Sequence, residues 1–280
     1  MAGRYRALQK GFILIKKGGG KMGGTLFHLG FDSRAVNAEY AILPGDPGRV
    51  AAIAERLDNV SALGNNREYR SVRGTLNGEG VVVCSTGIGG PSAAIAVEEL
   101  FMAGVTTFIR VGTCGGISLD VEPGDLIAAT AATRNEGTSY QYAPKSYPAA
   151  ASFECTAALK RAADGLGYPC HAGAVHSKDS FYSQHSPERM PISGRLEDEW
   201  QALKRLGVLA SEMECAAVYT VAASLGASAG AVLCALWNQE RIEAGLDSEA
   251  IMSREAPSAE RAIEVAVEAI KSLISANSVG

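Results

Sequence analysis

Residues 106–116 read TTFIRVGTCGG, and this stretch decides the fold class. Its apolar residues predict a strand covered on both faces, as in parallel sheets, and residues 112–116 predict a small-residue turn after it. Arg110 lies inside the strand, where a buried guanidinium is costly without an anionic partner. With the hydroxyl of Thr113 and the free N–H groups of a glycine turn, Arg110 predicts a phosphate site. The alternative is an arginine paired with a carboxylate behind an ordinary turn.

A second candidate anion site lies in residues 41–57, which read AILPGDPGRVAAIAERL. The pattern predicts a short apolar strand, a Pro/Gly turn and a helix with one apolar face. Arg49 falls in the first turn of that helix, where free N–H groups and the helix dipole already favour an anion. Gly45 and Arg49 are therefore a second candidate phosphate contact. A solvent-exposed arginine after a tight turn would give the same pattern.

Residues 80–104, GVVVCSTGIGGPSAAIAVEELFMAG, predict a strand, a turn and a helix. Pro91 suits the first helical position and Gly104 suits the position just past the helix end. The glycines of the turn are similar to a dinucleotide-binding fingerprint, but Ser92 stands where the third glycine belongs. No acidic residue follows at the distance of a ribose contact. We therefore expect no dinucleotide site here.

Two charged pairs mean little by themselves. Glu212 and Glu214 stand where a short strand turns into a helix, and a carboxylate at a helix start can simply favour the dipole. Arg67 is beside Glu68 just before a hairpin predicted over residues 72–83, and such a neighbouring pair is usually exposed.

Residues 179–189, DSFYSQHSPER, are polar and aromatic without apolar periodicity, so we expect a loop that caps the core or forms a pocket wall. Elsewhere, short apolar runs alternate with amphipathic segments, which predicts an α/β fold. The predicted strands are 125–132, 170–175 and 229–237; the predicted helices are 153–166 and 258–274, and a polar stretch covers 238–254.

Composition narrows the functional classes. The 280 residues are 47% hydrophobic, and a net charge of −4 argues against nucleic acid as a main partner. No apolar run approaches the roughly 20 residues of a membrane-spanning helix. Six cysteines without CxxC spacing, and no plausible signal peptide, predict a reducing, cytoplasmic location. We expect a flexible extension over residues 1–24 and a single domain over residues 25–280.

Five motifs follow one another along the chain: FHLG at 27–30, PGDPGR at 44–49, STGIGGPS at 85–92, FIRVGTCGG at 108–116 and SEMECAA at 211–217. Together they resemble the nucleoside phosphorylase family, and within it the enzymes that act on uridine. The resemblance implies a three-layer α/β/α fold around a central mixed sheet. It also implies reversible phosphorolysis of uridine or deoxyuridine to uracil and a pentose 1-phosphate in pyrimidine salvage, without an organic cofactor. The alternatives are a purine nucleoside phosphorylase, a hydrolytic nucleosidase and a non-catalytic binding relative.

The resemblance also implies roles for individual residues. Two of them, His28 and Arg67, would come from a neighbouring subunit, so the smallest active unit would be a homodimer, which bacterial relatives assemble into hexamers. Arg110, Glu214 and Thr113 would be catalytic. The phosphate ligands would be Gly45, Arg49, Arg67, Arg110 and Thr113; the ribose ligands His28, Met213 and Glu214; the base ligands Phe181, Gln184 and Arg189; and an interface cation would lie at Glu68, Ile88 and Ser92.

Two parts of the sequence bear on which base the protein would bind: the end of the last predicted strand and the polar, aromatic stretch over residues 179–189. Purine-specific relatives carry an aspartate acid after the last strand, whereas this chain has Asn238, which favours a pyrimidine. The uracil-reading glutamine and arginine of the family stand two residues apart, whereas Gln184 and Arg189 are five apart, with His185 also within reach. We expect Gln184 and Arg189 to read uracil, with the register of residues 183–189 left open.

Overall fold

The computed structural model of the protein describes residues 23–247 and 259–277. The extension expected over residues 1–24 lies outside the described residues, except for its last two glycines. So does the polar stretch beyond residue 247. Within the described ranges, no helix combines the length and apolar character needed to cross a bilayer.

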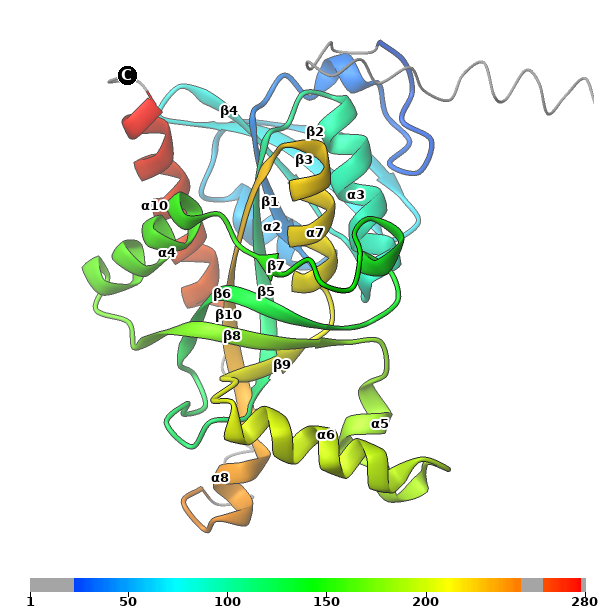
Figure 1. Ribbon diagram of the computed structural model, residues 1–280. Coiled ribbons are helices and arrows are strands. Elements are labelled where there is room, and N and C mark those ends of the chain that lie inside the picture. Colours follow the sequence, from blue (N-terminus) through cyan, green and yellow to red (C-terminus); the bar gives the residue numbers. More distant parts are fainter. Residues whose placement is uncertain (1–22, 248–258, 278–280) are drawn as a thin grey trace, which may run out of the picture.

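A single mixed sheet runs through the molecule (Figure 1). The strands β5, β10, β6, β8 and β9 pair in turn, and β9 pairs back with β5, so this part of the sheet closes on itself. From β5 the sheet continues through β1, β4 and β3 to β2. The strands are β1 (Tyr40–Pro44), β2 (Asp58–Asn66), β3 (Tyr69–Leu76), β4 (Glu79–Cys84), β5 (Thr107–Gly116), β6 (Leu126–Asn135), β7 (Ala149–Ala150), β8 (Cys170–Lys178), β9 (Ala210–Glu212) and β10 (Ser228–Asn238).

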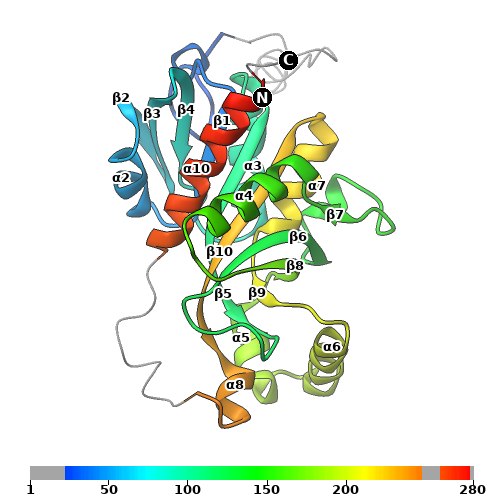
Figure 2. The same cartoon turned by 90° about the vertical axis from the view of Figure 1, so that its left-hand side faces the viewer.

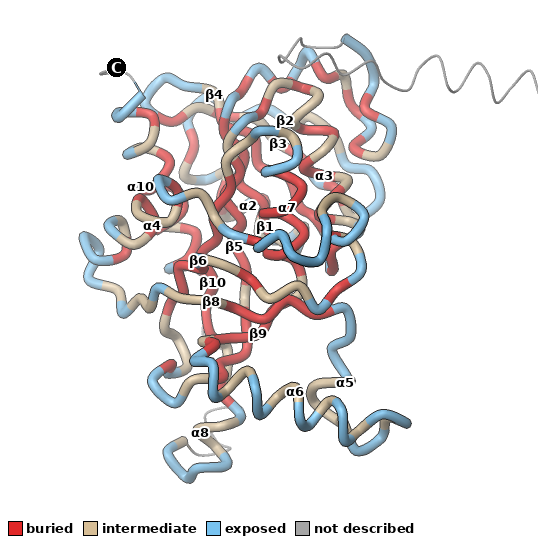
Figure 3. The backbone as a smooth tube through the Cα atoms, viewed as in Figure 1, coloured by how far each residue is buried: buried red, intermediate tan, exposed pale blue. Residues whose placement is uncertain are grey.

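Helices cover both faces of the sheet (Figures 1 and 2). The helices α3 and α7 share one apolar cluster with the strands, and α2, α4 and α10 share the other. This confirms the expected three-layer α/β/α fold around a mixed sheet. The buried residues lie mainly in the strands and these helices, whereas α5, α6 and α8, at one end of the molecule, contain no buried residue (Figure 3). The helices are α2 (Arg49–Ala54), α3 (Gly90–Met102), α4 (Phe153–Gly165), α5 (Phe181–His185), α6 (Ser193–Arg205), α7 (Cys215–Leu225), α8 (Gln239–Glu243) and α10 (Glu260–Asn277), with 3₁₀ turns η1 (Ser33–Ala35), η2 (Ser139–Gln141) and η3 (Pro187–Arg189).

The strand β5 continues where the sequence predicted a turn. It pairs with β10 as far as Gly116, so the expected glycine turn over residues 112–116 is wrong. The glycines instead admit neighbouring side chains: a Cβ on Gly112 would lie 2.6 Å from Leu233, and one on Gly116 would lie 2.6 Å from Asn238. Small residues in a strand can therefore mark close packing rather than a bend.

The opposite edge of β5 is shared between two strands. β1 pairs with residues 107–111, and β9 pairs with residues 115–116. Neither register includes residues 112–114, so the sheet has a gap on this edge. The expectation of accessible backbone just after Arg110 thus holds, although a break between two partner strands produces it rather than a turn.

Residues 179–189 also differ from the expectation of a loop. They form α5 and η3, and the side chain of Ser180 accepts a hydrogen bond from the N–H of Ser183 as an N-cap. A helix of five residues is too short for apolar periodicity to appear in the sequence. The strand β2 and the helix α6 were not anticipated either, and α6 contains no buried residue.

We predict that Gly74→Ala lowers the free energy of unfolding by about 1–3 kcal/mol, because a Cβ there would lie 2.7 Å from the Cβ of Leu57 in a packed region. Gly165→Ala is the matched control, since its Cβ would meet nothing within 4 Å at the end of α4. Urea unfolding of both variants measures the difference. Equal stabilities would show that the β3 position tolerates a side chain.

Candidate active site

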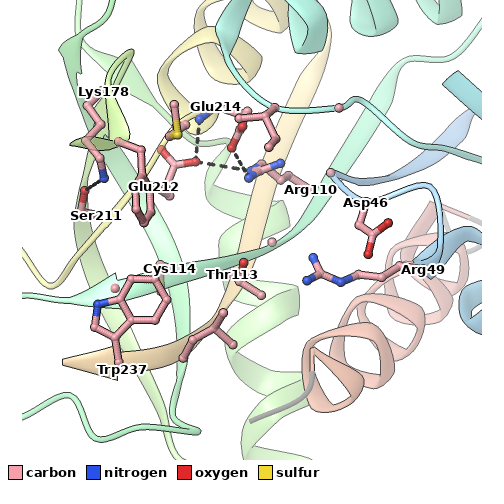
Figure 4. Close-up of a pocket in the computed structure, with 18 of the residues that line it drawn as sticks. Asp46, Arg49, Arg110, Thr113, Cys114, Lys178, Ser211, Glu212, Glu214 and Trp237 are labelled. Atoms are coloured by element: carbon pink, nitrogen blue, oxygen red, sulfur yellow. Dashed lines mark hydrogen bonds and ion pairs between the residues drawn. The ribbon is translucent and has the colours of Figure 1, made fainter. Parts of the chain in front are cut away.

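A cavity of about 630 Å³ opens at the gap beside β5. This volume suits a small organic ligand. Its wall includes the carboxyl end of β1, the start of α2, residues 112–115, and the segment from β9 to the start of α7. Ligand sites of open α/β sheets commonly lie at such strand ends. Figure 4 shows the side chains that converge there.

Arg110 is the central charged group of the cavity and is only 4% exposed. Its Nη2 forms an ion pair with Oε2 of Glu214, and its Nε lies 3.4 Å from Oε2 of Glu212. Burial alone would lower the pKa of Arg110, but these two carboxylates raise it above its ordinary value. Arg110 is therefore paired with carboxylates, as in the alternative interpretation, although no ordinary turn follows it. The Nε and Nη1 atoms still have no hydrogen-bond partner among the described residues, so donors remain for a ligand.

Glu212 and Glu214 make different contacts: one caps a helix, and the other faces the cavity. Oε2 of Glu212 accepts hydrogen bonds from the N–H groups of Glu214 at 2.8 Å and Cys215 at 2.9 Å, which satisfies the start of α7. Oε1 of Glu214 accepts from the N–H of Gly89 at 2.6 Å, at the start of α3. Burial raises the pKa of Glu214, whereas the Arg110 guanidinium opposes the shift. Glu212 thus caps the helix, and Glu214 faces the cavity beside Arg110.

One end of the cavity is suited to an anion. Gly45, Arg49 and Thr113 line it together with Arg110, as predicted (Figure 4). Arg49 begins α2 and is half-buried; burial lowers its pKa, Asp46 opposes that shift, and Arg110 adds to it. The Arg110 charge disfavours the charged form of Arg49, so an anion placed between the two guanidinium groups would relieve this repulsion.

The other end of the cavity is aromatic. The ring of His185 lies 4.4 Å from that of Phe181 and 5.7 Å from that of Trp237, centroid to centroid. Gly115 keeps this end open beside Trp237, because a Cβ there would come within 3.4 Å of the indole. We call this end of the cavity the aromatic slot; its rings contact one another and form a wall against which a flat heterocycle can pack.

A buried cation lies at this aromatic end. Nζ of Lys178 donates to Oγ of Ser211 at 2.5 Å, and Ser211 donates in turn to Oε1 of Gln184 at 2.6 Å. Lys178 is 6% exposed, and burial lowers its pKa to about 8 although Glu212 and Glu214 oppose the shift. Its ammonium also lies 5.8 Å from the ring centre of Phe181. The sequence reasoning missed Lys178, although a charge at the end of a buried strand is the same signal that identified Arg110.

Arg189 does not line the cavity. It is exposed in η3, whereas His185 is part of the cavity wall. The reason is helical spacing: Phe181 and His185 are four residues apart in α5 and therefore lie on one face. Burial, followed by the nearby Lys178 charge, lowers the pKa of His185 and favours its neutral form. The placement contradicts the expected alignment, in which Arg189 reads the base.

Several predicted site residues lie outside this cavity. His28 is paired with Glu99, and Arg67 occupies the turn between β2 and β3 with a left-handed φ of 55°. Oε1 of Glu68 accepts a hydrogen bond from Ser92 at 2.6 Å, the first cause of its lowered pKa. Two of the predicted residues do line the cavity: Ile88 is 77% exposed at the cavity rim, and Met213 is part of the wall.

Comparison with known proteins identifies the family. The sequence model of the Phosphorylase superfamily matches residues 39–271. The chain belongs to this superfamily. Among members of the superfamily, a uridine phosphorylase of Treponema pallidum is 45% identical over 252 residues, 90% of this chain and 95% of its own length. A uridine phosphorylase of Escherichia coli is 41% identical over 89% of this chain and 98% of its own. A guanosine phosphorylase of Halorubrum lacusprofundi is 40% identical over 84% of this chain and 94% of its own.

We predict that Arg110→Ala destabilises the fold by about 3–5 kcal/mol, because it leaves Glu212 and Glu214 buried without their counter-charge. The double variant Arg110→Met with Glu214→Gln should recover part of this loss, since it leaves one buried carboxylate, Glu212, without a counter-charge instead of two. Thermal or urea unfolding measures both, with Thr113→Val as a control that keeps the ion pair. A single variant as stable as the parent protein would show that the carboxylates do not depend on Arg110.

Proposed function

We propose that the protein is a pentosyltransferase that catalyses the reversible phosphorolysis of uridine, or deoxyuridine, to uracil and a pentose 1-phosphate. One observation carries the proposal: a single cavity holds Arg49 and Arg110 at one end, Glu214 in the middle, and Lys178 in an aromatic slot at the other. This order corresponds to phosphate, sugar and base. Membership of the superfamily and the two relatives named uridine phosphorylase support it.

Phosphate would bind between Arg49, Arg110, Thr113 and the backbone at Gly45, all on the cavity wall. Guanidinium groups bind phosphate oxygens with paired donors. Breaking the glycosidic bond develops positive charge on the sugar, so a phosphate held at C1′ both attacks that carbon and stabilises the transition state. Glu214 would orient the ribose hydroxyls, as contacts at the 2-OH do in glycoside hydrolysis, and Met213 would pack against the sugar.

The base leaves with negative charge, which Lys178 would neutralise. The ammonium is held by Ser211 and faces the slot formed by Phe181, His185 and Trp237. Gln184 would act through Ser211, whose hydroxyl it fixes. We propose Lys178 in place of Arg189 as the cation of the base site, because Lys178 is buried in the wall and Arg189 is exposed outside it.

The cavity argues against a purine substrate, although one relative is a guanosine phosphorylase. Asn238, the residue expected in place of an aspartate acid, is completely buried. Its amide donates to the carbonyl oxygens of Ser118 at 2.7 Å and Val121 at 2.9 Å, and its Oδ1 accepts from the start of α8. It is committed to the fold and cannot deliver a proton to a purine.

The proposal extends to assembly. His28 and Arg67 would complete the cavity of a neighbouring subunit, so the working unit would be a homodimer or a hexamer built from dimers, acting in cytoplasmic pyrimidine salvage. The carboxylate of Glu68 and the hydroxyl of Ser92, 2.6 Å apart, are hard oxygen ligands that fit an interface cation near Ile88. Such a cation would offset the Glu68 charge at the interface.

The deciding experiment is a turnover assay with uridine, deoxyuridine, inosine and guanosine, each with and without phosphate. We expect rapid cleavage of the pyrimidine nucleosides that requires phosphate. Cleavage without phosphate would instead identify a nucleosidase. Preference for guanosine or inosine would contradict the assignment of the base site.

We predict that kcat/KM for uridine falls as the pH rises through about 8, because Lys178 is a cation below its lowered pKa and neutral above it. In Lys178→Arg this fall should move to higher pH, since a guanidinium stays charged. Lys178→Met should lose about 10²- to 10³-fold in rate at every pH. Rate profiles across about pH 6 to 10 measure these effects.

The control for that experiment is Lys160→Met on the exposed surface of α4, which should keep the parent profile. If Lys178→Arg and the parent protein lose activity at the same pH, the titrating group is not Lys178.

A further inference from the structure

Glu99 is a buried carboxylate to which the mechanism above assigns no role. It lies in α3 and is 7% exposed. Its two oxygens accept hydrogen bonds from the backbone N–H of His28 at 2.9 and 3.0 Å and from that of Leu29 at 2.9 Å. Its Oε1 also lies 2.6 Å from Nδ1 of His28. One side chain therefore holds both the backbone and the ring of His28.

The loop that carries His28 is also held from the opposite side. Nδ2 of Asn66, at the end of β2, donates to the carbonyl oxygen of His28 at 2.8 Å. Gly30 packs against the same side chain, because a Cβ there would lie 3.0 Å from the Cβ of Asn66. The ring of Phe27 meets that of His28 edge to face at 4.8 Å. The imidazole is thus presented in one fixed orientation, with its side chain 30% exposed.

The contacts of Glu99 decide which ring nitrogen of His28 carries the proton. An ionised carboxylate has acceptors only, so the short contact to Nδ1 requires Nδ1 to be the donor. In the neutral imidazole, Nε2 is then unprotonated and presents a lone pair. The exposed side of His28 is consequently a hydrogen-bond acceptor, and it selects a ligand with a hydroxyl donor.

His28 lies far from the cavity of its own chain. The N–H of Gly89 at the start of α3 reaches Glu214 in the cavity, and Glu99 follows ten residues later. At 1.5 Å per residue this places Glu99 roughly 15 Å along the helix axis. Figure 1 shows the dark-blue segment before β1 beside the end of α3 that points away from β9. A role for His28 in ribose binding therefore requires the cavity of a neighbouring copy.

We propose that Glu99 is a positioning residue that fixes His28 with Nδ1 protonated, so that Nε2 accepts a hydrogen bond from the ribose 5′-hydroxyl in the neighbouring subunit's cavity. The inference rests on the proposed function, since it needs a nucleoside in that cavity. Glu99 itself touches no substrate and acts through the imidazole alone.

The isosteric variant Glu99→Gln separates positioning from packing. A glutamine has one acceptor oxygen and one NH₂ group, whereas both oxygens of Glu99 accept hydrogen bonds. It therefore cannot satisfy the N–H of His28, the N–H of Leu29 and the ring Nδ1 together. If its oxygen faces the backbone, its NH₂ meets Nδ1 and favours the tautomer with Nε2 protonated. The acceptor for the 5′-hydroxyl is then lost while the shape is kept.

The readout is discrimination between uridine and 5′-deoxyuridine, measured as the ratio of kcat/KM in the presence of phosphate. We expect the parent protein to favour uridine by about three- to tenfold, the effect of one neutral hydrogen bond. Glu99→Gln should bring the ratio close to one, as should His28→Ala, and the double variant should show no further change. Glu98→Gln, the neighbouring glutamate on α3, which contacts Tyr142, should keep the parent ratio.

Each other outcome has a separate meaning. A parent protein without phosphate-dependent cleavage of uridine would refute the proposed function. A parent protein that cleaves uridine but does not favour it over 5′-deoxyuridine, or a Glu99→Gln variant that keeps the parent ratio, would refute only the role of Glu99. If Glu99→Gln fails to fold, nitrogen NMR of histidine-labelled parent protein decides: protonated Nδ1 in His28 supports the inference, and protonated Nε2 overturns it.

Discussion

The ion pair between Arg110 and Glu214, with Glu212 beside it, is the interaction on which the site depends. It joins the middle of β5 to the segment between β9 and α7, and through the N–H of Gly89 it also reaches the start of α3. Three charges buried together are stable only while each has its partner. The same condition that stabilises the fold therefore also fixes the positions of these charged groups in the cavity.

The sheet provides the opening in which this cluster works. A strand with uninterrupted partners on both edges would have its backbone fully occupied. β5 is flanked by β10 along one edge, but on the other edge its pairing with β1 ends at Val111 and its pairing with β9 begins at Gly115. The cavity occupies that interval, so a feature of strand pairing, set by segments far apart in the sequence, fixes where a ligand enters.

Much of this arrangement could be predicted from the sequence, and the exceptions have physical causes. Arg110 was identified because a buried charge needs a partner, and Arg49 because the first turn of a helix favours an anion. Both arguments use only neighbouring residues in the sequence. The extension of β5 to Gly116 could not be predicted, since it depends on pairing with β10, more than a hundred residues away. α5 is too short to show a helical period, so we predicted Arg189 in the cavity wall, where the structure has His185. Lys178 was detectable by the reasoning applied to Arg110, which had not been extended to β8.

The two ends of α3 hold two different functional candidates, Glu214 at one end and His28 at the other. Its first turn supplies the N–H that holds Glu214, and its third turn carries the carboxylate that holds His28. In an assembly that shares His28 between copies, this helix acts as a rigid spacer whose length sets the separation between two active sites. Insertion or deletion of a single residue within it would rotate one end by about 100° relative to the other. Its length is therefore as strongly constrained as the identity of any residue in the cavity.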